Sequence, residues 1–220
     1  MAGEDHVATA RAVYDMAAAK YVQFVGTEIS SATEGPLDQS LLVAFIELVK
    51  RQAIHRVADV GCGPGRAAVF MAERGLEVVG VDPSQAMLAV ARSAHPQIRF
   101  EEGQLDALPF EVGVLAGAVC WYSIIHTPPD RLVEAFSELA RVLMPGGYLL
   151  LSFQAEGDPV CRTDAHGTRL PLTSYRHSVQ AVAAGLVDIG FKIYATVLRA
   201  PDLDAETTFQ GFVIASNLHS

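Results

Sequence analysis

Short apolar runs alternate with stretches of helical periodicity along most of the chain. From Arg56 onward the apolar runs have strand length, and the stretches between them repeat apolar residues on one helical face. We expect strands at residues 57–60, 77–82, 98–102, 114–120, 147–154, 191–198 and 208–215. Helices are expected to start near Arg66, Ser84, Pro128 and His177. This alternation is typical of right-handed βαβ units and predicts an α/β fold with a parallel sheet.

Two more helices are predicted ahead of the first strand. Apolar side chains recur on one face over about residues 7–25, and a second helix runs from Leu37 to about Gln52. The break between them falls at Glu34-Gly35-Pro36. Because both helices precede the first strand, they add to the sheet and form no crossover within it.

The chain length fits one domain, which we place at 1–220, because α/β domains commonly reach this size. Residues 1–55 would form its N-terminal helical segment and residues 56–220 its core. A polar, irregular insert at 155–177 interrupts that core. Such loops commonly carry specificity, so we expect this insert to lie beside a substrate.

Helix-start signals follow the fourth strand. Thr127 is predicted to cap the next helix, and Pro128 suits its first position, where no backbone N–H is needed. His126 therefore stands between the carboxyl end of a strand and the start of a helix. Ligands bind at this edge of open α/β sheets.

The first strand runs into the alternating glycines Gly61, Gly63 and Gly65, with Asp59 two residues ahead of them. Glycine lets the backbone approach a ligand closely. The second strand ends in Asp82, which sheet twist brings beside the turn, where a carboxylate accepts hydrogen bonds from a ribose diol. The spacing G-x-G-x-G differs from the dinucleotide fingerprint G-x-G-x-x-G. It therefore disfavours a nicotinamide oxidoreductase, for which the chain also lacks an obvious Tyr/Lys or Ser pair.

The glycine turn paired with Asp82 resembles motifs I and II of the class I S-adenosylmethionine-dependent methyltransferases. Further stretches match the habits of that family: 108–110, 141–147 and 184–191. The likeness covers roughly residues 7–215 and is greatest to the small-molecule enzymes of the ubiquinone-biosynthesis-like branch. It implies a Rossmann-like fold, with a seven-stranded, mostly parallel sheet, an antiparallel last strand, helices on both faces and an N-terminal helical lid.

The resemblance implies S-adenosyl-L-methionine as cofactor and S-adenosyl-L-homocysteine as product. It assigns the following residues to the cofactor: Tyr14, Tyr21, Asp59, Gly61, Cys62, Gly63, Gly65, Asp82, Pro83, Met87, Gln104, Leu105 and Trp121. Backbone groups of the turn would face the methionine end, and the Cys62 side chain would only pack. Gln104 replaces the Asp that many relatives use toward the adenine amino group, and Asp106 is an alternative acceptor. For Tyr14 and Tyr21 the alternative is ordinary packing, and for Asp59 it is bonding to nearby backbone N–H groups.

Methyl transfer from a sulfonium is an in-line displacement, so the protein mainly binds, aligns and excludes water. His126 is the candidate general base because histidine titrates near neutrality, the alternative being a histidine that holds a loop. Tyr122, His166 and Tyr175 are candidate contacts to the acceptor. The acceptor would be a small molecule with a hydroxyl, an amine or a carbanionic carbon. A catalytically silent cofactor-binding regulator or partner protein stays an alternative.

Charge and composition exclude several classes of binding partner. The formal net charge of −9 argues against nucleic acid, whose phosphates need clustered Lys and Arg, and against an anionic membrane surface. Three cysteines without a C-x-x-C pattern suggest neither a disulfide framework nor a metal site. The longest apolar run, 113–125, is too short to span a bilayer, and no signal peptide is apparent. We therefore expect a cytoplasmic monomer or homodimer.

Overall fold

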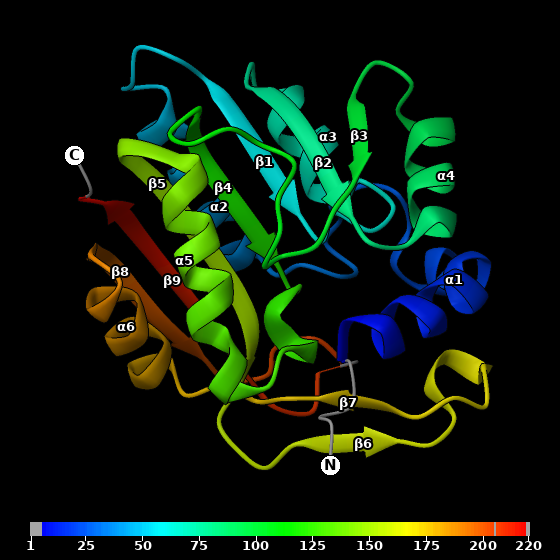
Figure 1. The fold of residues 1–220 in the computed structure, drawn as a ribbon. Helices are drawn as coiled ribbons and strands as arrows, with labels where there is room; N and C mark the ends of the chain where they lie inside the picture. Colours follow the sequence, from blue (N-terminus) through cyan, green and yellow to red (C-terminus); the bar gives the residue numbers. More distant parts are fainter. Residues whose placement is uncertain (1–5, 205, 219–220) are drawn as a thin grey trace.

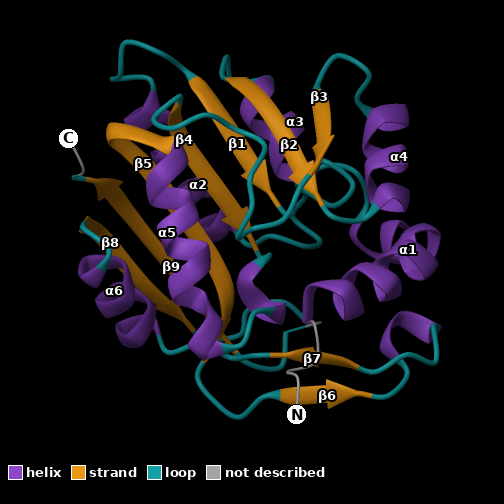
Figure 2. Cartoon of the chain, viewed as in Figure 1, coloured by secondary structure: helices purple, strands orange, loops and turns teal. Residues whose placement is uncertain are grey.

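The computed structural model describes residues 6–204 and 206–218. Figures 1 and 2 show one sheet with helices on both sides and a smaller hairpin beneath its carboxyl edge. The helices are α1 (His6–Val25), α2 (Pro36–Val49), α3 (Arg66–Ala72), α4 (Gln85–Ala94), α5 (Leu132–Val142) and α6 (Val179–Asp188), with short 3₁₀ turns η1 (Ile124–His126), η2 (Pro129–Arg131) and η3 (Ala165–Gly167). The strands are β1 (Arg56–Val60), β2 (Glu77–Asp82), β3 (Arg99–Glu102), β4 (Leu115–Trp121), β5 (Leu143–Ala155), β6 (Val160–Arg162), β7 (Leu172–Ser174), β8 (Phe191–Arg199) and β9 (Phe209–Asn217).

The main sheet has seven strands in the order β3-β2-β1-β4-β5-β9-β8. The pairs from β3 to β5 are parallel, and β9 runs antiparallel to both β5 and β8. The predicted seven-stranded sheet with an antiparallel last strand is confirmed. Strand β5 begins at Leu143, earlier than the predicted residue 147, because Leu143 already pairs with Leu115 ahead of an irregularity in register.

Helices cover both faces of this sheet, so its inner strands β1, β2 and β4 are buried on both sides, as parallel strands usually are. Side chains of α5 and α6 join one buried cluster with the strand residues on their side. Side chains of α2, α3 and α4 join a second cluster on the opposite face. The carboxyl ends of β1, β2 and β4 are left open toward α1, which creates the space described below.

The helix after β4 starts later than predicted. Thr127 closes the short turn η1, its N–H donating to the Ile124 carbonyl, and caps no helix. Pro128 takes an extended conformation because it precedes Pro129, and a residue before proline is driven away from the helical region. The 3₁₀ turn η2 follows, and α5 begins only at Leu132.

Helix α1 packs apart from the two main clusters. Its Val13 forms a third small cluster with Ala165 and Leu172 of the insert, flanked by Tyr14. The insert, which the sequence suggested to be irregular, contains the antiparallel pair β6–β7. Helix α1 also reaches α4, where Asp15 accepts hydrogen bonds from the Ser84 hydroxyl at 2.7 Å and the Ala86 amide at 3.2 Å.

A buried ion-pair cluster joins α2 to the end of β8. Arg199, at the end of β8, pairs with Asp38 of α2 at 2.8 Å and with Glu206 at 2.6 Å. Asp38 also accepts from the Gly35 amide at 3.1 Å. The Asp38 side chain is fully enclosed, so breaking the cluster would leave an uncompensated buried charge.

Across the described residues no helix is long and apolar enough to cross a membrane.

Candidate functional site

The glycine turn joins β1 to α3, and its amides bond within the protein. The N–H groups of Gly61 and Cys62 both donate to the Val81 carbonyl, at 2.7 and 3.0 Å. Gly61 has φ +71°, and a Cβ there would lie 2.3 Å from the Ser123 Cβ, so only glycine fits. The turn was predicted to offer backbone groups to a ligand. These amides are already used, and the Cys62 carbonyl accepts from the Gly65 amide at 2.9 Å. The carbonyl oxygen of Gly61, which lines the pocket, is therefore the group of the turn that is left for a ligand's donors.

Asp82 closes β2 beside this turn. Its carboxylate accepts from the Gly63 amide at 2.9 Å and from the Ser84 amide at 2.8 Å. Burial raises its pKa from 3.8 to about 6, an effect that the two amide hydrogen bonds partly offset. Asp82 still lines the pocket, so the amides orient its oxygens toward a ligand with donor groups.

Asp59 lies behind the turn and lines neither cavity described here. Its side chain is enclosed, and neither carboxylate oxygen makes a hydrogen bond of normal geometry to another described residue. Burial raises its pKa to about 7, and the Ala68 amide is the polar group that most favours its charged form. Asp59 therefore lies away from both cavities, and of the two roles considered for it, direct contact with a ligand is the one that this placement disfavours.

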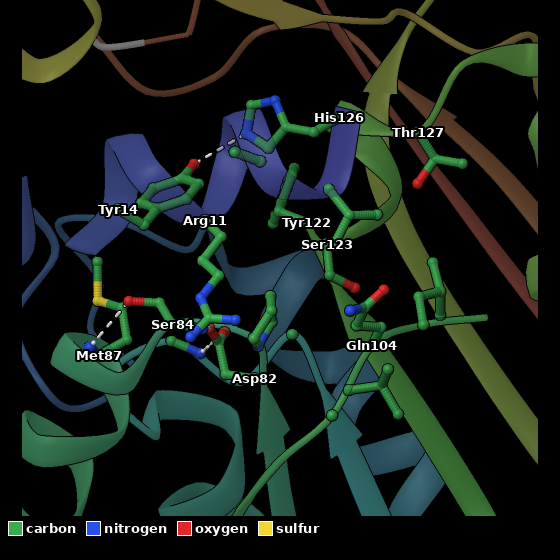
Figure 3. A pocket seen from close by; sticks show the side chains of 18 of the residues that line it. Arg11, Tyr14, Asp82, Ser84, Met87, Gln104, Tyr122, Ser123, His126 and Thr127 are labelled. Atoms are coloured by element: carbon green, nitrogen blue, oxygen red, sulfur yellow. Dashed lines mark hydrogen bonds between the residues drawn. The ribbon is translucent and has the colours of Figure 1, made fainter. Parts of the chain in front are cut away.

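The main pocket opens at the carboxyl ends of β1, β2 and β4 under α1 (Figure 3). Most of the predicted site residues line it: Tyr14, Tyr21, Gly61, Gly63, Asp82, Pro83, Met87, Gln104, Leu105, Trp121, Tyr122 and His126. Cys62 and Gly65 do not line it. Cys62 is buried among apolar groups, which raises the pKa of its thiol well above the ordinary value and suits a packing residue.

His126 connects three segments that are far apart in sequence. Its Nδ1 lies 2.8 Å from the Thr173 carbonyl of β7, and its Nε2 lies 2.9 Å from the Tyr14 hydroxyl of α1. A carbonyl only accepts, so Nδ1 carries the proton, Nε2 carries the lone pair and the Tyr14 hydroxyl donates. Figure 3 shows the tyrosine and the histidine facing each other above the pocket.

The electrostatic surroundings change the expectation for His126. Burial lowers the pKa of its imidazole to about 4, so the ring is neutral at pH 7 and does not titrate near neutrality as the sequence suggested. Burial also raises the pKa of the Tyr14 phenol well above its ordinary value, and the nearby Tyr21 and Asp82 add to this. Both partners are therefore uncharged at pH 7.

His166 and Tyr175, the predicted acceptor contacts from the insert, lie outside the main pocket. The His166 ring contacts the rings of Tyr14 and Tyr21, with centroids 5.6 and 5.4 Å away. Tyr175 lines a second, wider cavity, of about 710 Å³ against about 140 Å³ for the first. Both cavities are lined by Gln104 and His126, so they adjoin there.

Asp106, the alternative acceptor for an adenine amino group, lines the second cavity and not the first. Gln104 and Ala107 pair across a tight turn that contains Leu105 and Asp106. Within this turn Leu105 lines the first cavity and Asp106 lines the second. Gln104 therefore keeps the predicted position at the first pocket.

Several residues that line or support the pocket were not predicted, among them Arg11, Ser84, Ser123 and Glu34. Arg11 extends from α1 toward Asp82 in Figure 3 and forms ion pairs with Glu102 and Asp15. Ser84 and Ser123 line the wall. Glu34 lies behind it, pairs with Arg66 of α3 and accepts from the Trp121 indole at 3.4 Å. A capping serine after Asp82 was readable in the sequence, but nothing there singled out the others.

Comparisons with known proteins agree with this architecture. A methyltransferase-domain family model matches residues 57–147. Malonyl-acyl-carrier-protein O-methyltransferase of Salmonella typhimurium is 30% identical over 146 residues, covering 66% of this chain and 53% of that protein. An uncharacterized methyltransferase of Mycobacterium tuberculosis is 40% identical over 100 residues, covering 44% of this chain and 39% of that protein. The chain thus spans about half the length of such curated relatives, or less.

Solved structures share the whole fold. Magnesium protoporphyrin IX methyltransferase from Synechocystis, with bound S-adenosylmethionine, has a TM-score of 0.72 at 20% identity and covers 99% of both chains. The cyclase SpnF has a TM-score of 0.74 at 16% identity and covers 96% of both chains. The fold defines a Rossmann-like α/β protein of the class I methyltransferase type. The family model adds that residues 57–147 match a methyltransferase domain.

Proposed function

We propose that this protein transfers a methyl group from S-adenosyl-L-methionine to a small-molecule acceptor. The observation that carries the proposal is the pairing of Asp82 with the glycine turn at the floor of one pocket. The carboxylate is held by the Gly63 and Ser84 amides, and space is open beside Gly63, where a Cβ would meet nothing within 4 Å. A ribose diol supplies the donors that this buried carboxylate needs.

The residues present fit the cofactor in three places. Asp82 would accept from the ribose hydroxyls. Met87 and Leu105 line the wall next to Asp82 and would pack against the adenine. The Gly61 carbonyl of the turn would accept from the ammonium of the methionine end. When bound, the cofactor supplies an electrophilic methyl carbon that needs no metal or acid to activate it.

The chain's own contribution is to bind, align and exclude water. Helix α1 places Tyr14 and Tyr21 over the pocket, and its cluster with the insert holds it there. We infer that α1 acts as a lid over the cofactor. His126 lines both cavities. The first would hold the cofactor together with the reacting group of the acceptor, and the second would be the opening through which the acceptor enters.

The test has two stages. Calorimetry should show binding of S-adenosylmethionine and S-adenosylhomocysteine, but no binding of NAD. A screen of metabolite pools with methyl-labelled cofactor should then give a labelled small molecule and name the acceptor. NAD binding without a response to either sulfur ligand would overturn the cofactor. Cofactor binding without labelled product would favour a silent binding protein.

A further inference from the structure

We propose that Tyr14 and His126 form a proton relay in which the Tyr14 hydroxyl, and not the imidazole, meets the methyl acceptor. The proposal rests on the proposed function and adds two things to it. It gives Tyr14 a catalytic role, with His126 as the group that receives the proton. It also assigns the acceptor to molecules methylated on a hydroxyl oxygen.

The direction of the relay follows from the hydrogen bonds. The Thr173 carbonyl fixes the Nδ1–H tautomer of His126, which leaves Nε2 as the single basic atom of the ring. That atom is occupied by the Tyr14 hydroxyl at 2.9 Å. An acceptor in the main pocket therefore reaches the base through Tyr14. The backbone carbonyl holds the imidazole as a carboxylate does in a catalytic triad.

Tyr14 has the position for this contact. It extends from α1 into the pocket that holds Asp82, and its ring contacts those of Tyr21 and His166. Its phenol does not ionise alone, because burial and the neighbouring Tyr21 and Asp82 oppose the charge. It can act only by losing its proton to His126 as it gains one from the acceptor.

The groups around His126 allow its imidazole to take a proton from Tyr14 and to release it to solvent. The groups that act on its charge are Tyr14 and His6 on α1 and His166 on η3, and the two histidines disfavour its charged form. The imidazolium would therefore be short-lived. Because His126 also lines the second cavity, its proton has a route to water there.

Methyl transfer and the movement of two protons occur together. The acceptor oxygen forms a bond to the methyl carbon while the carbon–sulfur bond breaks and its electron pair stays on sulfur. The acceptor's proton moves to the Tyr14 oxygen, and the Tyr14 proton moves to His126 Nε2. Solvent in the second cavity then takes that proton, which restores the starting pair.

This arrangement distinguishes between acceptor classes. A neutral amine already carries a nucleophilic lone pair and can lose its proton after transfer. A hydroxyl becomes a good nucleophile only as its proton departs, so it gains most from a base in the transition state. A carbon acid also loses a proton, but its C–H is a poor hydrogen-bond donor to the Tyr14 oxygen. A relay built into the pocket wall thus points to an alcohol or phenol.

Kinetics on the acceptor found in the labelled screen test the relay. Tyr14→Phe and His126→Gln should each lower kcat by about 10²- to 10³-fold, a usual range for acid–base groups. The double variant should be no slower than either single one, because the two act as one unit. The dissociation constant for S-adenosylhomocysteine should change far less than kcat, because Tyr14→Phe keeps the aromatic ring that packs over the pocket. The matched control is Tyr148→Phe, because Tyr148 is a half-buried tyrosine on β5 that lines neither cavity.

A second readout needs no acceptor. In ¹⁵N NMR of the S-adenosylhomocysteine complex, His126 should show a protonated Nδ1 and a hydrogen-bonded, unprotonated Nε2. Tyr14→Phe should move only the Nε2 resonance, toward that of a free lone pair. A protonated Nε2 in the wild-type protein would overturn the relay even if methyl transfer is confirmed.

Three further outcomes also decide the question. Wild-type kcat in Tyr14→Phe refutes the relay. A joint loss of thermal stability and ligand affinity, with kcat kept, makes the Tyr14–His126 bond a latch for α1. A labelled amine as the main product refutes the acceptor class. If the screen gives no product at all, the proposed function fails, and the NMR result still decides whether the hydrogen-bonded pair exists.

Discussion

The pocket wall that holds Asp82 comes from one stretch of chain, whereas the wall that holds His126 is assembled from three distant segments. The first wall lies within residues 61–87, where two strand ends and a tight turn bond to each other through backbone groups. The second joins Tyr14 of α1, His126 of η1 and Thr173 of β7 through side chains. Backbone hydrogen bonds and the close packing of Gly61 against Ser123 therefore fix the Asp82 wall. The His126 wall depends on the small apolar cluster around Val13 and on two side-chain hydrogen bonds.

This difference predicts unequal tolerance of change. The glycine turn sits in the main core, so a disturbance there should unfold the domain. The α1–insert wall has its own cluster of Val13, Ala165 and Leu172, so a disturbance there should open the pocket and leave the sheet intact.

The largest effect should come from Gly61→Ala. The added Cβ would lie 2.3 Å from Ser123, in a conformation that L-residues disfavour. We expect a loss of about 3 kcal/mol or more in the free energy of unfolding. Gly63→Ala is the matched control: its Cβ meets nothing, so it should cost about 1 kcal/mol while hindering the ligand. Denaturant melts and calorimetry separate the two, and equal stability would show that the turn is not sterically fixed.

Asp82→Asn should weaken S-adenosylhomocysteine binding by about tenfold or more. The amide keeps the shape of the carboxylate but points one N–H₂ at a backbone donor and loses the charge. In the wild type, affinity should also fall as the pH drops through about 6, where Asp82 takes up a proton. Calorimetry between pH 5 and 8 should show this slope in the wild type and its loss in the variant. An unchanged dissociation constant would place the ribose elsewhere.

A smaller effect is expected from Asp59→Asn on the pH dependence of stability. The folded-state pKa of about 7 exceeds the unfolded value of 3.8, so the folded chain binds more protons between these pH values. The contribution of Asp59 to stability is therefore full below about pH 4 and is lost as the pH rises toward 7. The variant should gain thermal stability relative to the wild type at pH 8 and not at pH 4. A difference that is constant with pH would mean that Asp59 does not titrate in this range.

The smallest effect on global stability should come from Leu172→Ala in the α1–insert cluster. Loss of contacts there should raise amide hydrogen exchange in α1 and change the melting temperature by only a few degrees. Leu149→Ala, at a fully buried position of β5, is the comparison and should cost about 2–5 kcal/mol. Equal losses from both would mean that α1 and the sheet unfold together.

Most of the fold could be read from the sequence because its strands are apolar on both faces and end in turn signals. Val78 to Asp82 is one such run, and the structure ends β2 at that acid. Strands β6 and β7 were not predicted, because each has only three residues and neither shows an alternation of apolar and polar residues. The helix start at Thr127 was wrong because two successive prolines delay it.

The candidate site also has one part that could be predicted from the sequence and one part that could not. The Asp82 wall was predictable, since turn, glycines and acid lie within one βαβ unit. The link between Tyr14 and His126 spans 112 residues and depends on how α1 packs against the insert, so the sequence carried no local signal for it. The low pKa of His126 was missed for the same reason, because burial by those segments causes it.

The buried pair between Asp38 and Arg199 has a consequence for synthesis on the ribosome. The two residues are 161 positions apart, so at ordinary translation speeds the arginine emerges on the order of 10 s after the aspartate. During that interval α2 has a carboxylate that needs its partner to be buried without cost. Helix α2 should therefore stay undocked, with its apolar side exposed, until β8 has been made. We therefore expect the nascent chain to be most prone to aggregation before β8 and β9 have been made.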